Sequence, residues 1–112
     1  MKNVIVVPET DDFIGDLFNK EIIYINEALG EPQLKNNNAD YIAPYILAEQ
    51  RVLRVYEILE MRHVAPSYEI YLGNSFLVRG GWNGMGQHRK FEYHPLDKFN
   101  FKEIQLGFLI PA

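Results

Sequence analysis

The stretch YIAPYILAEQRVLRVYEILEMRHV at residues 41–64 decides the fold, because two structures fit it. Its apolar positions recur at helical spacing, at Tyr45, Ala48, Val52, Val55, Tyr56 and Leu59. The stretch is also rich in β-branched and aromatic residues, and Leu53, Val55, Leu59 and Met61 populate one face of a strand. Periodicity alone narrowly favours one long helix, and the strand interpretation stays open beside it.

Downstream of this stretch the sequence predicts strands. Short β-branched and aromatic runs lie at 68–72, 76–78 and 90–94 and are separated by turn residues. Apolar residues then alternate at Phe99 and Phe101 and again from 104 to 110, with a one-residue slip that predicts a bulge or a corner. We therefore expect strand content to exceed helix content.

Upstream, the sequence predicts two strands, a helix and a loop. Residues 4–7 form a β-branched run that predicts a buried strand. Thr10, followed by acidic residues and an apolar helical pattern, predicts a short helix over about 11–20. Residues 22–25 predict a second strand, and the asparagines at 36–38 predict a loop.

Length and composition predict one domain spanning residues 1–112. The chain is 47% hydrophobic, which is enough for one core. It has no cysteine and its three histidines fit no metal-ligand spacing, so we expect no disulfide, metal or cofactor. Only four consecutive apolar residues follow the N-terminus, so we expect a cytoplasmic protein without a membrane segment. The predicted fold class is α+β, a small curled sheet or pseudobarrel of about five to six strands with one or two short helices.

The order of the elements resembles a known group. An opening strand and a short helix precede YIAPY at 41–45, RVLRVYEI at 51–58, YLG at 71–73 and FEYHPL at 91–96. This order resembles the PUA-like superfamily, with EVE and ASCH domains nearest in layout, and the resemblance covers most of the chain. It implies that residues 51–61 are a barrel strand and that any helix shrinks to a turn around 48–50. It further implies binding of RNA or of a modified base in DNA, but it transfers no catalytic residue.

The segment RGGWNGMGQHRK at residues 79–90 is the most informative for function. Four of the eight glycines fall within seven residues, and the only tryptophan lies among them. Glycine lets the backbone approach a ligand closely, an indole face can stack on a base, and flanking cations can neutralise phosphate. The predicted nucleic-acid-binding residues are Arg79, Trp82, Asn83, His88, Arg89 and Lys90. The alternative is a hairpin loop whose Trp82 folds back onto the core.

The sequence carries no readable catalytic signature. His88 and His94 titrate near neutral pH, but no partner for either is identifiable from the sequence. The acidic residues at 11–16 are explained by a helix dipole, and Glu57 and Glu60 lack the neighbouring Glu-x-Lys pattern of restriction-type nucleases. The glycine-rich segment matches neither a dinucleotide-binding fingerprint nor a Walker loop.

Charge is distributed unevenly along the chain. The net charge is −4, with seven acidic and three basic residues in 1–35 but five basic and two acidic residues in 79–102. Such asymmetry can mark a local anion-facing patch. It is also what an ordinary solvated surface looks like, and that interpretation is favoured on the sequence alone. Two functions follow as expectations. The first is a PUA-like module that recognises RNA or a modified nucleobase through the glycine-rich loop. The second is a protein-interaction or structural accessory module, of phage or mobile-element type, whose loop meets a protein partner.

Overall fold

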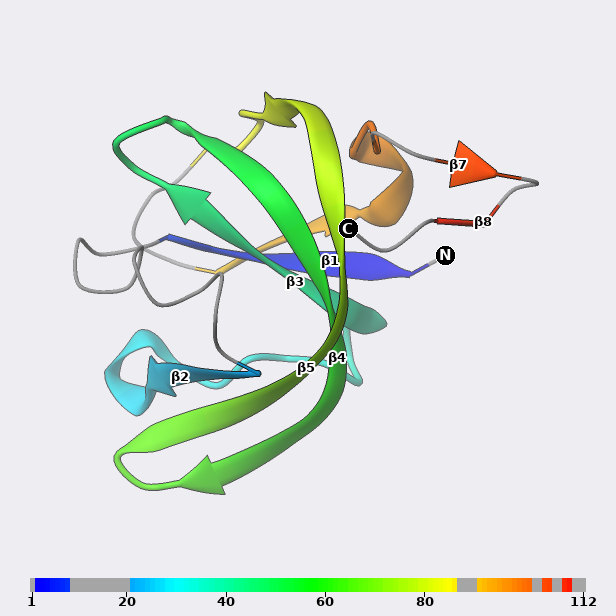
Figure 1. The fold of residues 1–112 in the computed structure, drawn as a ribbon. Coiled ribbons are helices and arrows are strands. Elements are labelled where there is room, and N and C mark those ends of the chain that lie inside the picture. Colours follow the sequence, from blue (N-terminus) through cyan, green and yellow to red (C-terminus); the bar gives the residue numbers. More distant parts are fainter. Residues whose placement is uncertain (1, 9–20, 87–90, 102–103, 106–107, 110–112) are drawn as a thin grey trace.

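One six-stranded mixed sheet dominates the computed structural model, which describes residues 2–8, 21–86, 91–101, 104–105 and 108–109. The strands are β1 Asn3–Pro8, β2 Ile22–Asn26, β3 Ala39–Ile46, β4 Arg51–Val64, β5 Ser67–Trp82 and β6 Glu92–Pro95. Their order is β2-β5-β4-β3-β1-β6, and only β1 and β3 pair in parallel. The short strands β7 Ile104–Gln105 and β8 Phe108–Leu109 pair separately (Figure 1).

The curled sheet is confirmed, whereas the helices of an α+β fold are not seen in the described residues. There the only helical elements are two three-residue 3-10 turns, η1 Glu27–Leu29 and η2 Leu96–Lys98. The helix predicted over 11–20 lies outside the described residues. Within the described chain the sheet is open, with β2 and β6 as its edges. No helix among these residues is long and apolar enough to cross a membrane.

Residues 41–64 are two strands and a turn, so the helix favoured by periodicity is wrong. Strands β3 and β4 pair antiparallel across a turn at residues 47–50, where Gln50 has a φ of 53°. The register of β4 against β5 shifts between Val52 and Arg54. Because of that irregularity, Val52 and Val55 lie three residues apart yet enter the same apolar cluster, which imitates helical spacing.

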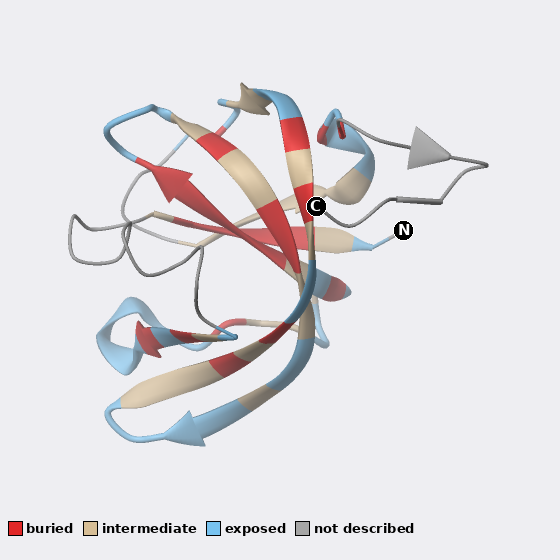
Figure 2. Cartoon of the chain, viewed as in Figure 1, coloured by how far each residue is buried: buried red, intermediate tan, exposed pale blue. Residues whose placement is uncertain are grey.

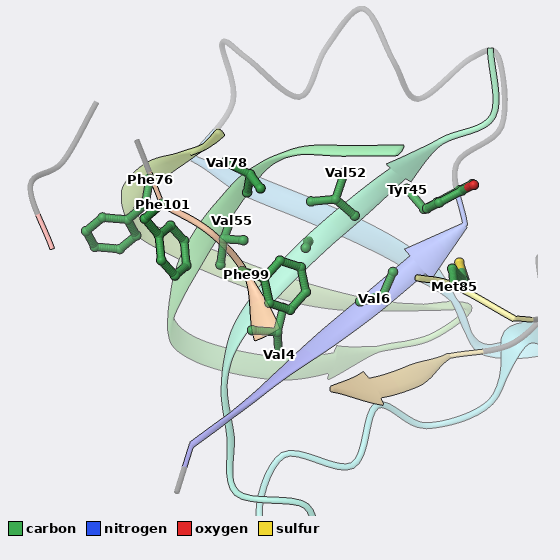
Figure 3. Close-up of a cluster of buried hydrophobic side chains, with 11 residues drawn as sticks. Val4, Val6, Tyr45, Val52, Val55, Phe76, Val78, Met85, Phe99 and Phe101 are labelled. Atoms are coloured by element: carbon green, nitrogen blue, oxygen red, sulfur yellow. The ribbon is translucent and has the colours of Figure 1, made fainter. Parts of the chain in front are cut away.

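Two apolar clusters lie on opposite faces of β1. Val4 and Val6 enter the first cluster, whereas Ile5 and Val7 enter the second. Successive side chains on a strand point to opposite faces, so four consecutive apolar residues are buried only if both faces are covered. Figure 2 shows β1 as a nearly continuous buried band, and Figure 3 shows Val4 and Val6 among the side chains of the first cluster. The predicted buried strand is confirmed.

The β4–β5 hairpin covers both clusters with its two ends. We define its upper end as residues 51–56 with 74–82, and its lower end as residues 57–64 with 67–73 (Figure 1). The upper end supplies Val52, Val55, Phe76 and Val78 to the first cluster, and the lower end supplies Ile58, Met61, Ile70 and Leu72 to the second. The register is irregular between Tyr56 and Glu60, where the ends meet. Bulges increase strand twist, which lets one ribbon cover two faces.

Candidate binding site

Half of the predicted site residues fall within the described chain. Arg79 is exposed on β5, Trp82 is half-buried at the end of β5, and Asn83 follows it on the surface. His88, Arg89 and Lys90 lie outside the described residues. The described part of the predicted site therefore lies at the upper end of the β4–β5 hairpin.

A column of aromatic rings connects Trp82 to the first cluster. The indole stacks on Phe99, with ring centroids 4.8 Å apart and an interplanar angle of 28°. The column continues from Phe99 through Phe101 and Phe76 to Tyr41, with centroid separations of 6.4, 6.0 and 6.3 Å. Figure 3 shows the rings of Phe76, Phe99 and Phe101 gathered in this cluster. Trp82 is thus anchored on the core through the ring contact with Phe99.

The glycine-rich segment passes directly over the indole. A Cβ atom at Gly84 would lie 2.7 Å from Cζ2 of Trp82, closer than van der Waals contact allows. Gly80 and Gly81 have φ angles of 72° and 74°, which favour glycine because a Cβ is strained there. The glycines therefore allow the chain to turn and to approach Trp82 closely, and this packing leaves less of the indole available for stacking than the sequence suggested.

A histidine–carboxylate pair lies against Trp82. His94 is T-shaped to the indole, with centroids 4.6 Å apart, and its Nε2 is 2.9 Å from Oε1 of Glu92. The two side chains are 24% and 19% exposed. An ionised carboxylate can only accept, so Nε2 of His94 donates to Glu92. In the neutral imidazole this leaves Nδ1 as an acceptor, whereas in the protonated imidazole Nδ1 is a second donor.

Glu92 also holds the glycine-rich segment. Its Oε1 accepts a hydrogen bond of 3.1 Å from the backbone N–H of Gly86. The same carboxylate oxygen therefore links β6, the imidazole of His94 and the segment that follows Trp82. This arrangement orients the imidazole and fixes the path of residues 84–86 beside it.

The sequence indicated His94 as a candidate, but it did not predict Glu92 as the partner of His94. Glu92 and His94 are two residues apart on β6, so their side chains share one face of the strand. Glu-x-His inside a strand is the signal that could have indicated the pair, but it required the strand to be assigned first. Tyr93, between them, faces the second cluster instead, where its hydroxyl oxygen accepts a 2.7 Å hydrogen bond from the N–H of Gln33.

A second histidine–carboxylate pair lies at the lower end of the hairpin. Nε2 of His63 is 2.8 Å from Oε2 of Glu27, and the imidazole stacks on Tyr68 at 4.4 Å. The side chains of His63 and Glu27 are 51% and 44% exposed, about twice as exposed as those of His94 and Glu92. The two pairs share their chemistry and differ in burial, which makes His63 a matched control for His94.

The described residues contain no group of three or more His, Asp or Glu side chains that could hold a metal ion. Comparison with protein-family models, with curated proteins and with solved structures finds no match for the chain. The chemistry of the site itself is therefore the basis for a functional proposal.

Proposed function

We propose that the protein is a small PUA-like binding module that recognises RNA or a modified nucleobase at the Trp82 end of the β4–β5 hairpin. The observation that carries the proposal is the half-buried Glu92–His94 pair at the exposed end of the aromatic column. A few oriented polar groups at the edge of an apolar, aromatic surface are typical of small-ligand sites.

A nucleobase matches the two kinds of contact that this end offers. Bases stack on aromatic side chains, and their edges present amino and imino donors. Glu92 holds the imidazole of His94 in place, and Nδ1 of the neutral imidazole is an acceptor for such a donor; the indole of Trp82 lies beside the imidazole. The base would contact His94 and the indole edge, because Phe99 and Gly84 pack against the indole itself.

Basic residues around the same end would neutralise phosphate. Arg79 is exposed on β5, three residues before Trp82. Arg89 and Lys90, which follow in the sequence, extend the proposed site together with Asn83 and His88. Arginine and lysine contacts to phosphate make nucleic-acid affinity fall as salt rises.

Titration of Trp82 emission with mixed-sequence single-stranded RNA at low salt tests the proposal. We expect the emission to change on binding and the His94→Ala variant to lose about 1–3 kcal/mol of binding energy, the range for a base contact. Glu92→Gln should weaken binding less, because an amide oxygen still accepts from Nε2. The matched control His63→Ala should bind as the wild type does. An emission that stays unchanged, together with no retention in filter binding, would exclude the RNA proposal.

Trp82→Ala separates the structural from the binding contribution of the indole. Because Trp82 is half-buried on Phe99, we expect a loss of about 2 kcal/mol of stability, below the 3–5 kcal/mol of a fully buried aromatic residue. Fluorescence anisotropy of labelled RNA then measures binding by the remaining folded protein. A large loss of stability with unchanged RNA affinity would assign Trp82 to the core alone.

A protein-interaction module is the second candidate, and exposed apolar side chains at the lower end favour it. Tyr24, Leu59 and Val64 are 50%, 69% and 52% exposed on β2 and β4. Exposed apolar patches mark protein interaction sites. Under this candidate, substitution of Leu59 by Lys should abolish partner capture, whereas His94→Ala should not affect it.

A further inference from the structure

Three arginines share the side of the upper end of the β4–β5 hairpin that faces away from the first cluster, where Arg79 is exposed and Arg51 and Arg54 are partly buried. Arg54 lies opposite Leu77 in the register, and Nη1 of Arg54 donates a 3.0 Å hydrogen bond to Oγ of Ser75 on the same side. Arg79 is exposed and follows the buried Val78, so it points away from the first cluster.

Arg51 completes this set at the start of β4. It precedes the buried Val52, and its aliphatic chain lies across Gly81, where a Cβ would clash with it. Nη1 donates a 3.3 Å hydrogen bond to the carbonyl oxygen of Gly80, and Nη2 is 3.0 Å from the exposed carboxylate of Glu49. These contacts hold the guanidinium close to the surface of the sheet.

The two ends of the hairpin differ in charge. The upper end, residues 51–56 and 74–82, contains three arginines and no acidic residue. The lower end, residues 57–64 and 67–73, contains three glutamates and one arginine. That arginine, Arg62, is bound to Glu60 through two hydrogen bonds of 3.0 and 3.3 Å and lies over the ring of Tyr71. Arg51 at the upper end is likewise paired, with Glu49. Counted over the strands, the upper end is the more favourable end of the hairpin for a polyanion.

We propose that Arg51, Arg54 and Arg79 form an arginine face that binds the phosphate backbone of a single nucleic-acid strand. The inference rests on the proposed function and adds the path that the nucleic-acid backbone follows over the protein. Arg51 and Arg54 are three strand residues apart, roughly 10 Å, and Arg79 lies on the neighbouring strand. Trp82 pairs with Val52 and packs on the first-cluster side of β5, opposite the arginines, so a strand whose phosphates lie on the face places a base beside His94 by passing around the end of β5. Guanidinium groups suit this role because their fork of donors matches phosphate oxygens.

The salt dependence of RNA binding tests the arginine face. Anisotropy of a labelled mixed-sequence single-stranded RNA is measured over a series of salt concentrations for the wild type and for the triple variant R51A/R54A/R79A. Each phosphate contact on a single strand contributes about 0.7 to the slope of log affinity against log salt, so the slope should become shallower by about two. The triple lysine variant R51K/R54K/R79K retains the charges and should keep most of the slope. Arg62→Ala, the matched control, should leave the slope unchanged.

The outcomes separate this inference from the proposed function. A wild-type slope retained by the triple alanine variant overturns the arginine face, while loss of affinity in His94→Ala would still support the base site. A shallower slope in the triple alanine variant with full affinity in His94→Ala supports the face and overturns the base site. Absence of RNA binding by the wild type overturns both. Circular dichroism of each variant shows whether it is folded, and the lysine variant tests the charges if the alanine variant fails to fold.

Discussion

The upper and lower ends of the β4–β5 hairpin are built from the same ribbon but present different surfaces. The upper end contributes mainly to the first apolar cluster and the lower end to the second, and a histidine–carboxylate pair within hydrogen-bonding distance lies beside each end. At the upper end the Glu92–His94 pair is half-buried against Trp82, and the hairpin strands there contain three arginines and no acidic residue. At the lower end the Glu27–His63 pair is exposed, and the hairpin strands contain three glutamates and one arginine.

This difference shows why a residue pair alone does not mark a site. The distances in the two pairs are 2.9 and 2.8 Å, almost equal. An exposed pair is screened by water and contributes little, whereas a half-buried pair is oriented by its neighbours. Burial, aromatic packing and the surrounding charge therefore favour His94 over His63 as the functional histidine.

The largest expected effect is a loss of stability when a buried side chain of either apolar cluster is truncated. Phe99→Ala in the first cluster should cost about 3–5 kcal/mol of unfolding free energy, and Ile25→Ala in the second about 2–5 kcal/mol, because both side chains are buried. Urea unfolding measures both losses. Only Phe99→Ala should also shift the native emission of Trp82, since the indole stacks on that ring. An equal shift in Ile25→Ala would show that the clusters are not separate.

Glycines at the two ends should differ in their tolerance of a methyl group. Gly84→Ala places a Cβ 2.7 Å from the indole of Trp82, which is held by Phe99, and should cost about 1–3 kcal/mol. Gly73→Ala meets the Cδ2 atom of the exposed Leu59 at 3.0 Å, which can move aside, so the cost should be smaller. Thermal melts compare the two variants. A greater loss in Gly73→Ala than in Gly84→Ala would contradict the proposed packing of the segment over Trp82.

Stability at alkaline pH should depend on Tyr93. Burial raises the pKa of the Tyr93 hydroxyl, and the hydrogen bond from the N–H of Gln33 partly offsets this. A pKa above the unfolded value of about 10 means that the stabilisation is present below pH 10 and is lost as the pH rises through the folded pKa. Tyr93→Phe should cost about 1 kcal/mol at neutral pH, because the Gln33 N–H loses its acceptor, and should flatten the alkaline decline.

Tyr71→Phe is the comparison for that measurement. A hydrogen bond to Glu69 is the main reason that the pKa of the half-buried Tyr71 is raised, with burial second. Removal of the Tyr71 hydroxyl should change the neutral stability less than Tyr93→Phe does, because it leaves a side-chain carboxylate, not a backbone N–H, without that hydrogen bond. Urea unfolding at neutral pH and above pH 10 measures the loss of stability in each variant and its decline in alkali. If Tyr71→Phe and Tyr93→Phe lose equal stability at neutral pH, the Gln33–Tyr93 hydrogen bond has no structural role.

The smallest effect is expected for the exposed histidine pair. His63→Ala should change stability by no more than about 0.5 kcal/mol, as for other surface ion pairs. His94→Ala should cost about 1 kcal/mol, because it leaves a half-buried Glu92 carboxylate with one partner fewer. Thermal melts at neutral pH distinguish them, and a larger loss for His63→Ala would reverse the ranking of the two ends.

Local patterns identified most strand-forming segments, but they divided the single strand β5, Ser67–Trp82, into separate strands at 68–72 and 76–78, and they misread the longest ambiguous stretch. The run at residues 4–7 predicted a buried strand, and both faces of β1 are covered. Residues 41–64 imitated a helix, because the irregular register of β4 brings Val52 and Val55 into one cluster and places Tyr56 in the other. A spacing rule assumes one buried face, and this hairpin has a different buried face at each end.

The sequence by itself determined that strands outnumber helices, that residues 4–7 are buried, and that a glycine-rich, tryptophan-containing segment ends a strand, because these properties follow from local composition and backbone preference. Only the tertiary structure decided that Trp82 packs on Phe99 and that Glu92 and His94 meet beside it. It also decided that Arg51 and Arg54 lie on the same side of the sheet as Arg79, which is 25 or more positions away in the chain. Strand register brings such residues together, and register depends on long-range pairing that no local pattern encodes.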